Sequence, residues 1–480
     1  MTPPAVPLHL GGSLRLHIVG VGGPGMSAIA IVLAQMGHRV SGSDIRERAI
    51  LDRVRAAGVE VIVGHDRAIV HGCDAVTASS AIPATNIELQ EAQRIGVPVL
   101  RRAGMLGSIC AMADSLAVAG THGKTTTTSM LMLILAEAGL RPNFVVGGDV
   151  NDVGTGAQWT GERWLVVEAD ESDGTHLELP LAGAILTNVE ADHLDHYGTL
   201  DAIIDSFRTF LANVDGPRVV CADDRLAATL ADELRASGDT RTITYGIDDP
   251  HRSGTPDFVA DDVVASRGTT SFRVSRDGQP LGRIDLPLRG VHNVRNATAA
   301  LAMAMSIGVP FDDARRSLNR FGGVVRRFDV RAQFDDITLV DDYAHLPSEI
   351  QVVLRAARTS GDPWRRVVAV FQPNRYNRMS ELSPEYADAF VDADLVVLTD
   401  IYASGTTPIP GVTGKLVVNA VTEAHPEQRV VWLPKRDDLI DYLARTLAPG
   451  DVCISMGCGD VALLPDEVVE RRSELVESNR

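Results

Sequence analysis

Short apolar segments alternate with longer amphipathic segments along most of this sequence. An apolar run of about four to eight residues predicts a buried strand, and apolar positions repeating about every 3.6 residues predict a helix. The first 113 residues show this alternation, which is typical of a parallel α/β sheet and predicts a Rossmann-like domain. Its strands are predicted at Leu14–Val19, His38–Ser41, Asp74–Ala78 and Val97–Leu100, and its first helix at Met26–Met36.

The alternation restarts after residue 113 and predicts a second α/β domain over residues 114–323. Residues 250–290 change to short alternating β-type stretches, such as Thr270–Val274, which predict an added β segment. The boundary is placed at Phe321–Gly323, where two glycines follow the last helical pattern. The other predicted elements are strands Ser115–Ala119, Trp164–Val167, Ala184–Leu186 and Arg218–Cys221, and helices Thr125–Ala138 and Asn293–Ile307.

Residues 324–480 repeat the pattern and predict a third, again Rossmann-like, α/β domain. Three domains suit a chain of 480 residues, because a single core stops growing near about 250–300 residues. The charged tail, Asp466–Arg480, predicts a solvated helix. The strands are predicted at Ile337–Val340, Val367–Phe371, Leu395–Leu398, Val430–Leu433 and Val452–Ser455.

Composition narrows the class of protein. The longest apolar runs, Met130–Ala136 and Leu395–Leu398, are far shorter than the roughly 20 residues of a membrane span. Met1–Gly12 has no basic residue ahead of an apolar core, so no signal peptide is expected. We therefore expect a cytoplasmic protein without membrane insertion. The net charge of −18 argues against a nucleic-acid partner.

The five cysteines are scattered, so they predict reduced thiols in the core rather than disulfides or a zinc site. Lysine is more informative. Of the 45 basic residues only Lys124, Lys415 and Lys435 are lysines. A lysine kept inside a glycine-threonine loop indicates that a compact ammonium is required there.

That loop lies between a predicted strand and a predicted helix. Backbone N–H groups in such a loop form an anion cradle, so the sequence predicts an ATP site. Lys124 is expected to reach the terminal phosphates, and the Thr125 hydroxyl to hold Mg²⁺. Val118 stands where the strict motif has glycine, so this is a shortened variant of the motif; the alternative is a glycine turn followed by a threonine-rich helix cap. The residues predicted to bind ATP here are Gly120, Thr121, His122, Gly123, Lys124, Thr125 and Thr126.

Acidic residues follow the next buried strands. Glu168 ends one of them, and in the same parallel sheet as a phosphate loop it is predicted to be a Mg²⁺ ligand. Without that loop, a solvated acidic turn would be the better interpretation. The segment Thr187–His196 is dense in groups that can bind a metal, and His193 is predicted to be a second metal ligand.

A second glycine fingerprint opens the first domain. It predicts that a nucleotide diphosphate lies against a helix N-terminus, and a nucleotide-sugar satisfies it as well as NAD does. A nicotinamide-dependent dehydrogenase stays an alternative, but it leaves the Lys124 loop unexplained. The residues of this predicted site are Gly20, Gly22, Gly23, Gly25 and Asp44.

Taken together, these motifs resemble the Mur ligase family across essentially the whole chain. The resemblance implies an ATP-dependent amide ligase of peptidoglycan synthesis that adds L-alanine to UDP-N-acetylmuramate through an acyl phosphate, releasing ADP and phosphate. The matching segments are Gly20–Ser27, Gly120–Thr127, Glu168–Asp173, Thr187–Asp195, Gly290–Asn296, Arg326–Asp329, Asp341–His345, Phe371–Arg378, Pro408–Gly411 and Met456–Asp460.

The resemblance also implies roles for individual residues. Asn293 would contact the adenine, and Arg327 and Asp342 would close onto the nucleotide. The residues at the amino-acid and sugar-carboxylate end would be Tyr343, His345, Arg375 and Arg378. The UDP part would also meet Ser79 and Ser80. The groups implied to take part in catalysis are Lys124, His193, His345 and Arg375, with His193 and His345 both candidates for the base that deprotonates the amine.

Two positions depart from the family, which usually has histidine where Leu346 and Asn374 stand; either change puts substrate orientation in doubt. Several sibling ligases steady a magnesium ion with a carbamylated lysine, but no lysine exists here between Lys124 and Lys415.

Three alternatives stay open besides the dehydrogenase. They are a sibling ligase for another amino acid, a sibling that recycles a preformed peptide, and a nucleotide-dependent switch protein without ligase activity. The oligomeric state, including a homodimer, is left open.

Overall fold

A computed structural model describes residues 8–79, 81–252 and 254–478. The chain forms two compact units. The first contains the described residues of Met1–Asp262, Phe272–Ile284 and Val294–Gly322. The second contains those of Val263–Ser271, Asp285–Asn293 and Gly323–Arg480.

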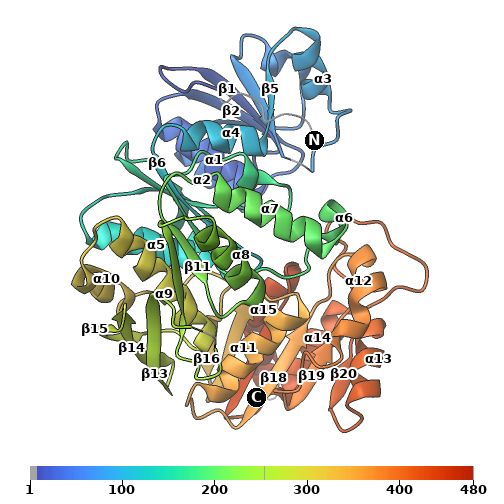
Figure 1. Ribbon diagram of the computed structural model, residues 1–480. Coiled ribbons are helices and arrows are strands. Elements are labelled where there is room, and N and C mark those ends of the chain that lie inside the picture. The colour runs from blue at the N-terminus through green and yellow to red at the C-terminus, as the bar shows by residue number, and fades with distance from the viewer. Residues whose placement is uncertain (1–7, 80, 253, 479–480) are drawn as a thin grey trace. The chain divides into compact units, whose positions relative to one another are not determined.

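The N-terminal sheet of the first unit, blue in Figure 1, has the strand order β3-β2-β1-β4-β5, and its pairings are all parallel. Leu16, Ile18 and Val19 are fully buried on its central strand, as expected for a sheet covered on both faces. Its strands are β1 (Arg15–Val19), β2 (Arg39–Asp44), β3 (Glu60–Val63), β4 (Ala75–Ala78) and β5 (Val99–Arg101). Its helices are α1 (Pro24–Gln35), α2 (Ala49–Ala56), α3 (Ile87–Arg94) and α4 (Arg102–Cys110).

The second sheet has the order β15-β14-β13-β12-β11-β10-β6-β9-β7-β8. Its inner strands β9, β6, β10, β11 and β12 run parallel, so their carboxyl ends share one edge. The strands are β6 (Asp114–Ala119), β7 (Asn143–Val150), β8 (Thr155–Gln158), β9 (Trp164–Glu168), β10 (Gly183–Leu186), β11 (Arg218–Cys221), β12 (Thr242–Ile247), β13 (Phe258–Ser266), β14 (Thr269–Arg276) and β15 (Gln279–Leu286). The α-helices are α5 (Lys124–Glu137), α6 (Leu194–Tyr197), α7 (Leu200–Ala212), α8 (Arg225–Ala236), α9 (Val291–Ser306) and α10 (Phe311–Leu318).

The third sheet, in the second unit, has the order β16-β17-β21-β18-β19-β20, with β16 antiparallel at one edge. Its strands are β16 (Asp329–Phe334), β17 (Ile337–Asp342), β18 (Arg366–Phe371), β19 (Leu395–Leu398), β20 (Val430–Trp432) and β21 (Asp451–Met456). Its α-helices are α11 (Pro347–Thr359), α12 (Tyr376–Leu382), α13 (Lys415–Ala424), α14 (Arg436–Thr446) and α15 (Leu464–Ser478).

The predicted α/β architecture with one sheet for each of three segments is confirmed. Two details of the prediction were wrong. Helix α15 is not solvated on every face, because Leu464 and Val468 are buried in the core of the third sheet. Two of the cysteines, Cys73 and Cys458, are only half-buried rather than core residues.

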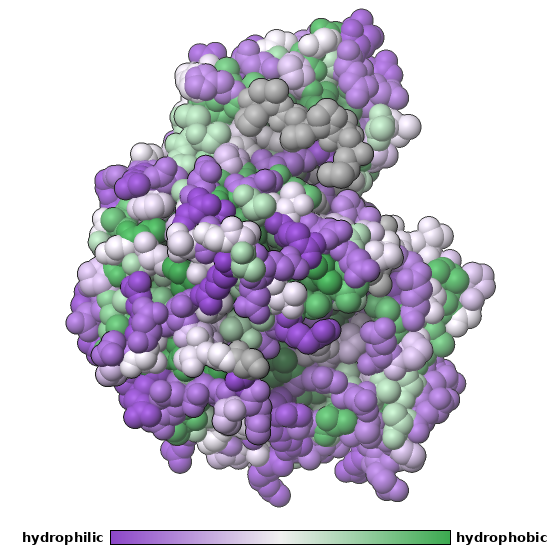
Figure 2. Space-filling view, in the orientation of Figure 1, coloured by the Kyte–Doolittle hydropathy of each residue, from purple (hydrophilic) through white to green (hydrophobic). Residues whose placement is uncertain are grey.

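No helix within the described part of the chain is long and apolar enough to cross a membrane. On the face drawn in Figure 2, hydrophobic residues lie in small groups between hydrophilic ones.

Candidate active site

The glycine loop with Lys124 lies at the carboxyl end of β6, in the middle of the second sheet. The strands beside β6 are β9, which ends at Glu168, and β10, which leads into Thr187 and Asn188. Parallel strands end at the same edge of a sheet, so these three segments meet there. The structure therefore brings these three sequence motifs together at one edge of the sheet.

Thr187 and Asn188 hold the loop in shape. The Thr187 hydroxyl donates to the His122 carbonyl at 2.6 Å, and the His122 N–H donates to the Asn188 side chain at 2.8 Å. Two glycines are needed for this fit. A Cβ on Gly120 would lie 2.2 Å from the Thr187 hydroxyl, and Gly123 has a φ of +82°, which favours glycine. Gly123 is also the N-cap of α5, so the helix begins at Lys124 with its free N–H groups at the loop.

Lys124 points back into its own loop. Its Nζ donates to the Gly120 carbonyl at 2.7 Å and to the Thr121 carbonyl at 3.2 Å. It also lies 2.8 Å from each carboxylate oxygen of Glu171, whose side chain is only 5% exposed. Lys124 is itself mostly buried, so the pair is shielded from water. Sequence reasoning missed Glu171.

The charges around this pair shift several pKa values. Burial lowers the pKa of Lys124, but the carboxylates of Glu171, Asp170 and Glu168 outweigh it and the pKa is raised. Burial raises the pKa of Glu171 to about 7, against the opposing effect of Lys124. For Asp170 burial is overcome by Lys124 and Arg102, and the pKa of this carboxyl is lowered. At neutral pH the site therefore holds a charged lysine among acids.

Arg102, at the start of α4, was also missed. Its guanidinium donates to Asp173 at 2.8 Å and to Asp170 at 3.0 Å, both in the loop after β9. Its Nη1 lies 3.1 Å from the position that a Cβ on Gly25 would occupy. This arginine therefore links the N-terminal glycine loop to the acidic loop beside Lys124.

Glu168, Thr125 and His193 are the predicted metal ligands. One Glu168 oxygen accepts the Gly147 N–H at 2.8 Å, while Thr125 lies in the first turn of α5. His193 has a φ of +54°, an uncommon backbone for this residue type, and its Nε2 lies 3.3 Å from Asp192. Among the residues that the structure describes, no three His, Cys, Asp or Glu side chains form a metal cluster.

The residues of the N-terminal glycine loop converge at the carboxyl ends of β1, β2 and β4. Gly22 donates its N–H to Asp44 at 2.9 Å, and Gly20 has a φ of +80°. Gly23 is the N-cap of α1, so this loop also ends at a helix N-terminus. Ser79 follows β4 and donates its N–H to the Val19 carbonyl at 3.2 Å. Ser80 lies outside the described residues.

In the second unit, Asp342 organises the loop after β17. Its carboxylate accepts the N–H groups of Phe328 and Ala344, each at 2.7 Å, and burial raises its pKa to about 6. The guanidinium groups of Arg326 and Arg327 lie 5.0 and 5.3 Å from the centre of the Tyr343 ring. Such cation–π contacts gather positive charge beside this ring.

His345, Arg375 and Arg378 belong to the same unit. The His345 ring lies edge-on to Tyr343 at 5.5 Å, and its Nδ1 lies 3.2 Å from Glu349. Arg375 has a φ of +61°, a strain often found at functional positions.

The two departures from the family have structural roles. Asn374 accepts a hydrogen bond from Arg378 at 3.2 Å, and Leu346 is buried at the N-cap of α11. Asn293 is buried and donates to the Arg289 carbonyl at 2.8 Å.

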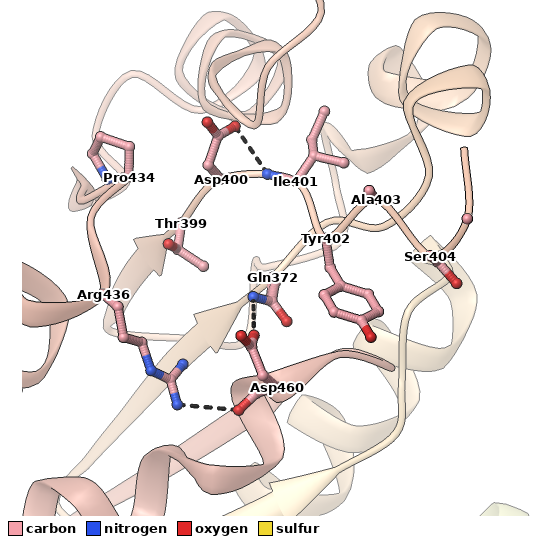
Figure 3. Close-up of a pocket in the computed structure, with 11 residues that line it drawn as sticks. Gln372, Thr399, Asp400, Ile401, Tyr402, Ala403, Ser404, Pro434, Arg436 and Asp460 are labelled. Atoms are coloured by element: carbon pink, nitrogen blue, oxygen red, sulfur yellow. Dashed lines mark hydrogen bonds between the residues drawn. The ribbon is translucent and has the colours of Figure 1, made fainter. Parts of the chain in front are cut away.

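A pocket of about 460 Å³ opens beside the Arg375 loop, at the carboxyl ends of β18 and β19 (Figure 3). Tyr402 lines it and accepts the Arg375 N–H on its carbonyl at 2.9 Å. Gln372 donates to Asp460 across its floor at 2.7 Å. The pocket wall therefore fixes the strained backbone that presents Arg375.

Three family models match successive parts of the chain. They are described as "Mur ligase family, catalytic domain" over residues 15–113, "Mur ligase middle domain" over residues 118–304, and "Mur ligase, glutamate ligase domain" over residues 326–459.

Similar proteins cover nearly the full length. A UDP-N-acetylmuramate–L-alanine ligase from Geobacter sp. (strain M21) is 42% identical over 466 residues, which is 97% of this chain and 99% of that protein. A protein of the same name from Pelotomaculum thermopropionicum is 40% identical over 96% of this chain and 98% of its own length. The crystal structure of the UDP-N-acetylmuramate–alanine ligase from Thermotoga maritima has a TM-score of 0.79 at 27% identity, covering 96% and 99% of the two chains. A murein peptide ligase from Psychrobacter arcticus has a TM-score of 0.67 at 25% identity, covering 95% and 98%.

Proposed function

The chain belongs to the Mur ligase family, and from that membership we propose that it is the ATP-dependent ligase that joins L-alanine to UDP-N-acetylmuramate in peptidoglycan synthesis. The relatives with this name align over nearly the whole of both chains. The observation that carries the proposal within the structure is the Lys124 loop, joined through the acidic loop and Arg102 to the N-terminal glycine loop.

An amide forms from a carboxylate only after the carboxylate is activated. A carboxylate oxygen of the muramate bonds to the γ-phosphorus of ATP as the bond to ADP breaks, giving an acyl phosphate. The L-alanine nitrogen then bonds to the acyl carbon, phosphate leaves, and a base accepts the amine proton. The first step brings two anions together, so the main demands are positioning and charge stabilisation.

We assign these demands to particular residues of this chain. We assign the N–H groups at the start of α5 and the Lys124 ammonium to the β- and γ-phosphates, because they lie at one helix N-terminus. Gly120, Thr121, His122, Gly123, Thr125 and Thr126 complete the proposed ATP site. Gly20, Gly22, Gly23, Gly25, Asp44, Ser79 and Ser80 form the proposed site for the UDP part.

The second unit supplies the remaining proposed contacts. Asn293, Arg327 and Asp342 are assigned to the nucleotide, and Tyr343, His345, Arg375 and Arg378 to the amino acid and sugar carboxylate. The base is proposed to be His345, or His193 if that ring does not hold the metal. Histidine is suited to this role, because the ordinary pKa of its ring lies near neutrality.

Magnesium is proposed as the metal. Carboxylate and hydroxyl oxygens from Glu168 and Thr125 suit a hard cation, and His193 would be the third protein ligand. Few protein ligands are expected, because magnesium in such sites keeps water and phosphate oxygens. When bound, it would neutralise charge on the phosphates.

The remaining proposals are domain boundaries at residues 1–113, 114–323 and 324–480, a cytoplasmic location, and no nucleic-acid partner. A homodimer stays open as an assembly state.

The test is ADP release with each co-substrate omitted in turn. We expect release only when ATP, UDP-N-acetylmuramate and L-alanine are all present. Release that needs neither co-substrate would indicate a nucleotide switch protein instead. A preference for D-glutamate, or for a preformed peptide, over L-alanine would indicate a sibling ligase.

A further inference from the structure

Lys124 has no free donor in this structure. An ammonium has three N–H groups, and its contacts are two loop carbonyls and the Glu171 carboxylate. A lysine that is to bind a terminal phosphate must therefore give up at least one of these contacts. The carbonyls belong to the loop that would wrap the phosphates, whereas Glu171 comes from the neighbouring strand's loop.

We propose that Glu171 is the resting counter-ion of Lys124, and that the polyphosphate of the nucleotide displaces it on binding. This inference rests on the proposed ATP-dependent function. It makes Glu171 a positioning residue, since it acts through Lys124.

Glu171 is poorly satisfied apart from this ion pair. Its Oε2 is buried and accepts no hydrogen bond among the described residues, although it lies 2.8 Å from Nζ. A buried carboxylate needs hydrogen bonds to offset the loss of water. One that lacks them, and faces a lysine in a phosphate loop, fits a temporary pair better than a purely structural one.

The backbone of Glu171 is held by hydrogen bonds, so this residue does not shift as a whole when the lysine moves. Tyr197 donates its hydroxyl to the Glu171 carbonyl at 2.6 Å, and the Gly174 N–H donates to the same oxygen at 3.0 Å. The Ser206 hydroxyl donates to the Tyr197 oxygen at 3.4 Å, and Ser206 in turn contacts buried His176 at 2.6 Å. Once Lys124 moves to a phosphate, Glu171 stays behind as a buried acid without its cation.

Two effects then weaken nucleotide binding. Breaking the Lys124–Glu171 contact costs free energy, and so does leaving the buried Glu171 side chain without its cation beside the phosphates. Weaker binding of ATP does not slow the reaction as long as the cellular ATP concentration is high. Weaker binding of ADP lets this product leave after each turnover. Glu171 therefore sets the affinity of the site below what Lys124 alone would give.

The experiment measures binding of AMP, ADP and a non-hydrolysable ATP analogue to wild type and to Glu171→Gln by titration calorimetry. We expect tighter binding of ADP and the ATP analogue in the variant, by about fivefold or more, with a smaller change for AMP. The KM for ATP should fall without a rise in kcat. A purely structural role would weaken binding or leave it unchanged, and either result overturns the proposal.

Glu178→Gln is the matched control. Glu178 is a largely buried acid seven positions away that pairs with Arg101 rather than with the phosphate loop. Its loss should leave all three affinities unchanged. Tightening of the same size in this control would mean a general charge effect and would also overturn the proposal.

A second measurement needs no variant and covers the case in which Glu171→Gln fails to fold. In a crystal structure of the wild type with ADP, Lys124 Nζ should contact a phosphate and lie beyond hydrogen-bond distance from Glu171. An intact pair beside bound ADP overturns this inference alone. Wild-type protein that binds no nucleotide would overturn the proposed function as well.

Discussion

The two glycine loops, at the start of α1 and at the start of α5, have the same backbone plan but differ in the charged groups beside them. Each follows a central parallel strand and ends at a helix whose N-cap is glycine. In the first loop Gly22 donates to the acid Asp44, and the loop itself carries no lysine. In the second, Lys124 is surrounded by the acids of the loop after β9.

The difference follows from what each proposed ligand does. A diphosphate that is only held needs backbone donors at a helix N-terminus. A triphosphate that reacts develops charge at its end, so a mobile cation is needed there. On this proposal, the same strand-loop-helix unit serves ligand binding in one place and the reaction in the other, and Lys124 distinguishes the two.

Replacing Lys124 is expected to have the largest effect, because this lysine distinguishes the second loop from the first. Lys124→Ala should lower the rate of ADP formation by about 10³-fold or more, because the charge opposite the γ-phosphate is lost. The measurement is steady-state turnover, with circular dichroism to check the fold. Lys415→Ala, at an exposed position, is the control. Turnover near the wild-type rate in Lys124→Ala would contradict the proposed site.

A pair of glycine substitutions should separate the two loops. A Cβ on Gly22 would lie 2.6 Å from the Asp44 carboxylate, and one on Gly123 would lie 2.6 Å from the Asn296 side chain. Gly22→Ala should raise the KM for UDP-N-acetylmuramate about tenfold or more, and Gly123→Ala the KM for ATP by a similar factor. If each variant raised both KM values equally, the loops would not serve different ligands.

Arg102 contacts elements of both regions, so replacing it should weaken the binding of both proposed ligands. Arg102→Ala removes the guanidinium that pairs with Asp170 and Asp173, beside both proposed phosphate sites. Both KM values should rise, each by about three- to tenfold. Arg101→Ala, which removes a more exposed pairing with Glu178, is the control. A rise in one KM alone would place Arg102 at a single site.

Buried His176, which contacts Ser206, should make the free energy of unfolding depend on pH. Burial lowers the pKa of His176 to about 4, from 6.5 when exposed. As pH falls from 6.5 to 4, the unfolded chain gains a proton that the folded chain does not, so the free energy of unfolding falls, by up to about 3 kcal/mol from this group. His176→Phe should flatten that slope in urea titrations across this window. An unchanged slope would show that the pKa of His176 is the same in the folded and the unfolded chain, and would contradict this prediction.

Contiguous motifs explain why so much was predictable. The residues of the loop, from Gly120 to Thr126, are consecutive in the sequence. The loop lies between a strand and a helix that the hydrophobic pattern alone predicts. Parallel sheet order then brings Glu168 and Thr187 to the same edge. Glu171 could not be chosen among the acids from Glu168 to Asp173. Only the turn in that loop decides which of them faces Lys124.

The second unit was harder to predict. Its strands were found, yet the antiparallel edge strand β16 was not, because its alternation is weak and half-exposed. The positive φ of Arg375 and the pocket beside it depend on contacts with a segment near Tyr402, far along the chain. The roles of these residues stay predictions.

The scarcity of lysine has a practical consequence. With the three lysine side chains Lys124, Lys415 and Lys435, a sample labelled with ¹³C at the lysine ε-carbon should give three side-chain signals in an NMR spectrum. Two belong to exposed residues and one to the buried ammonium. The proposed ATP site of this protein thus carries its own isolated spectroscopic reporter, readable without assigning any other resonance.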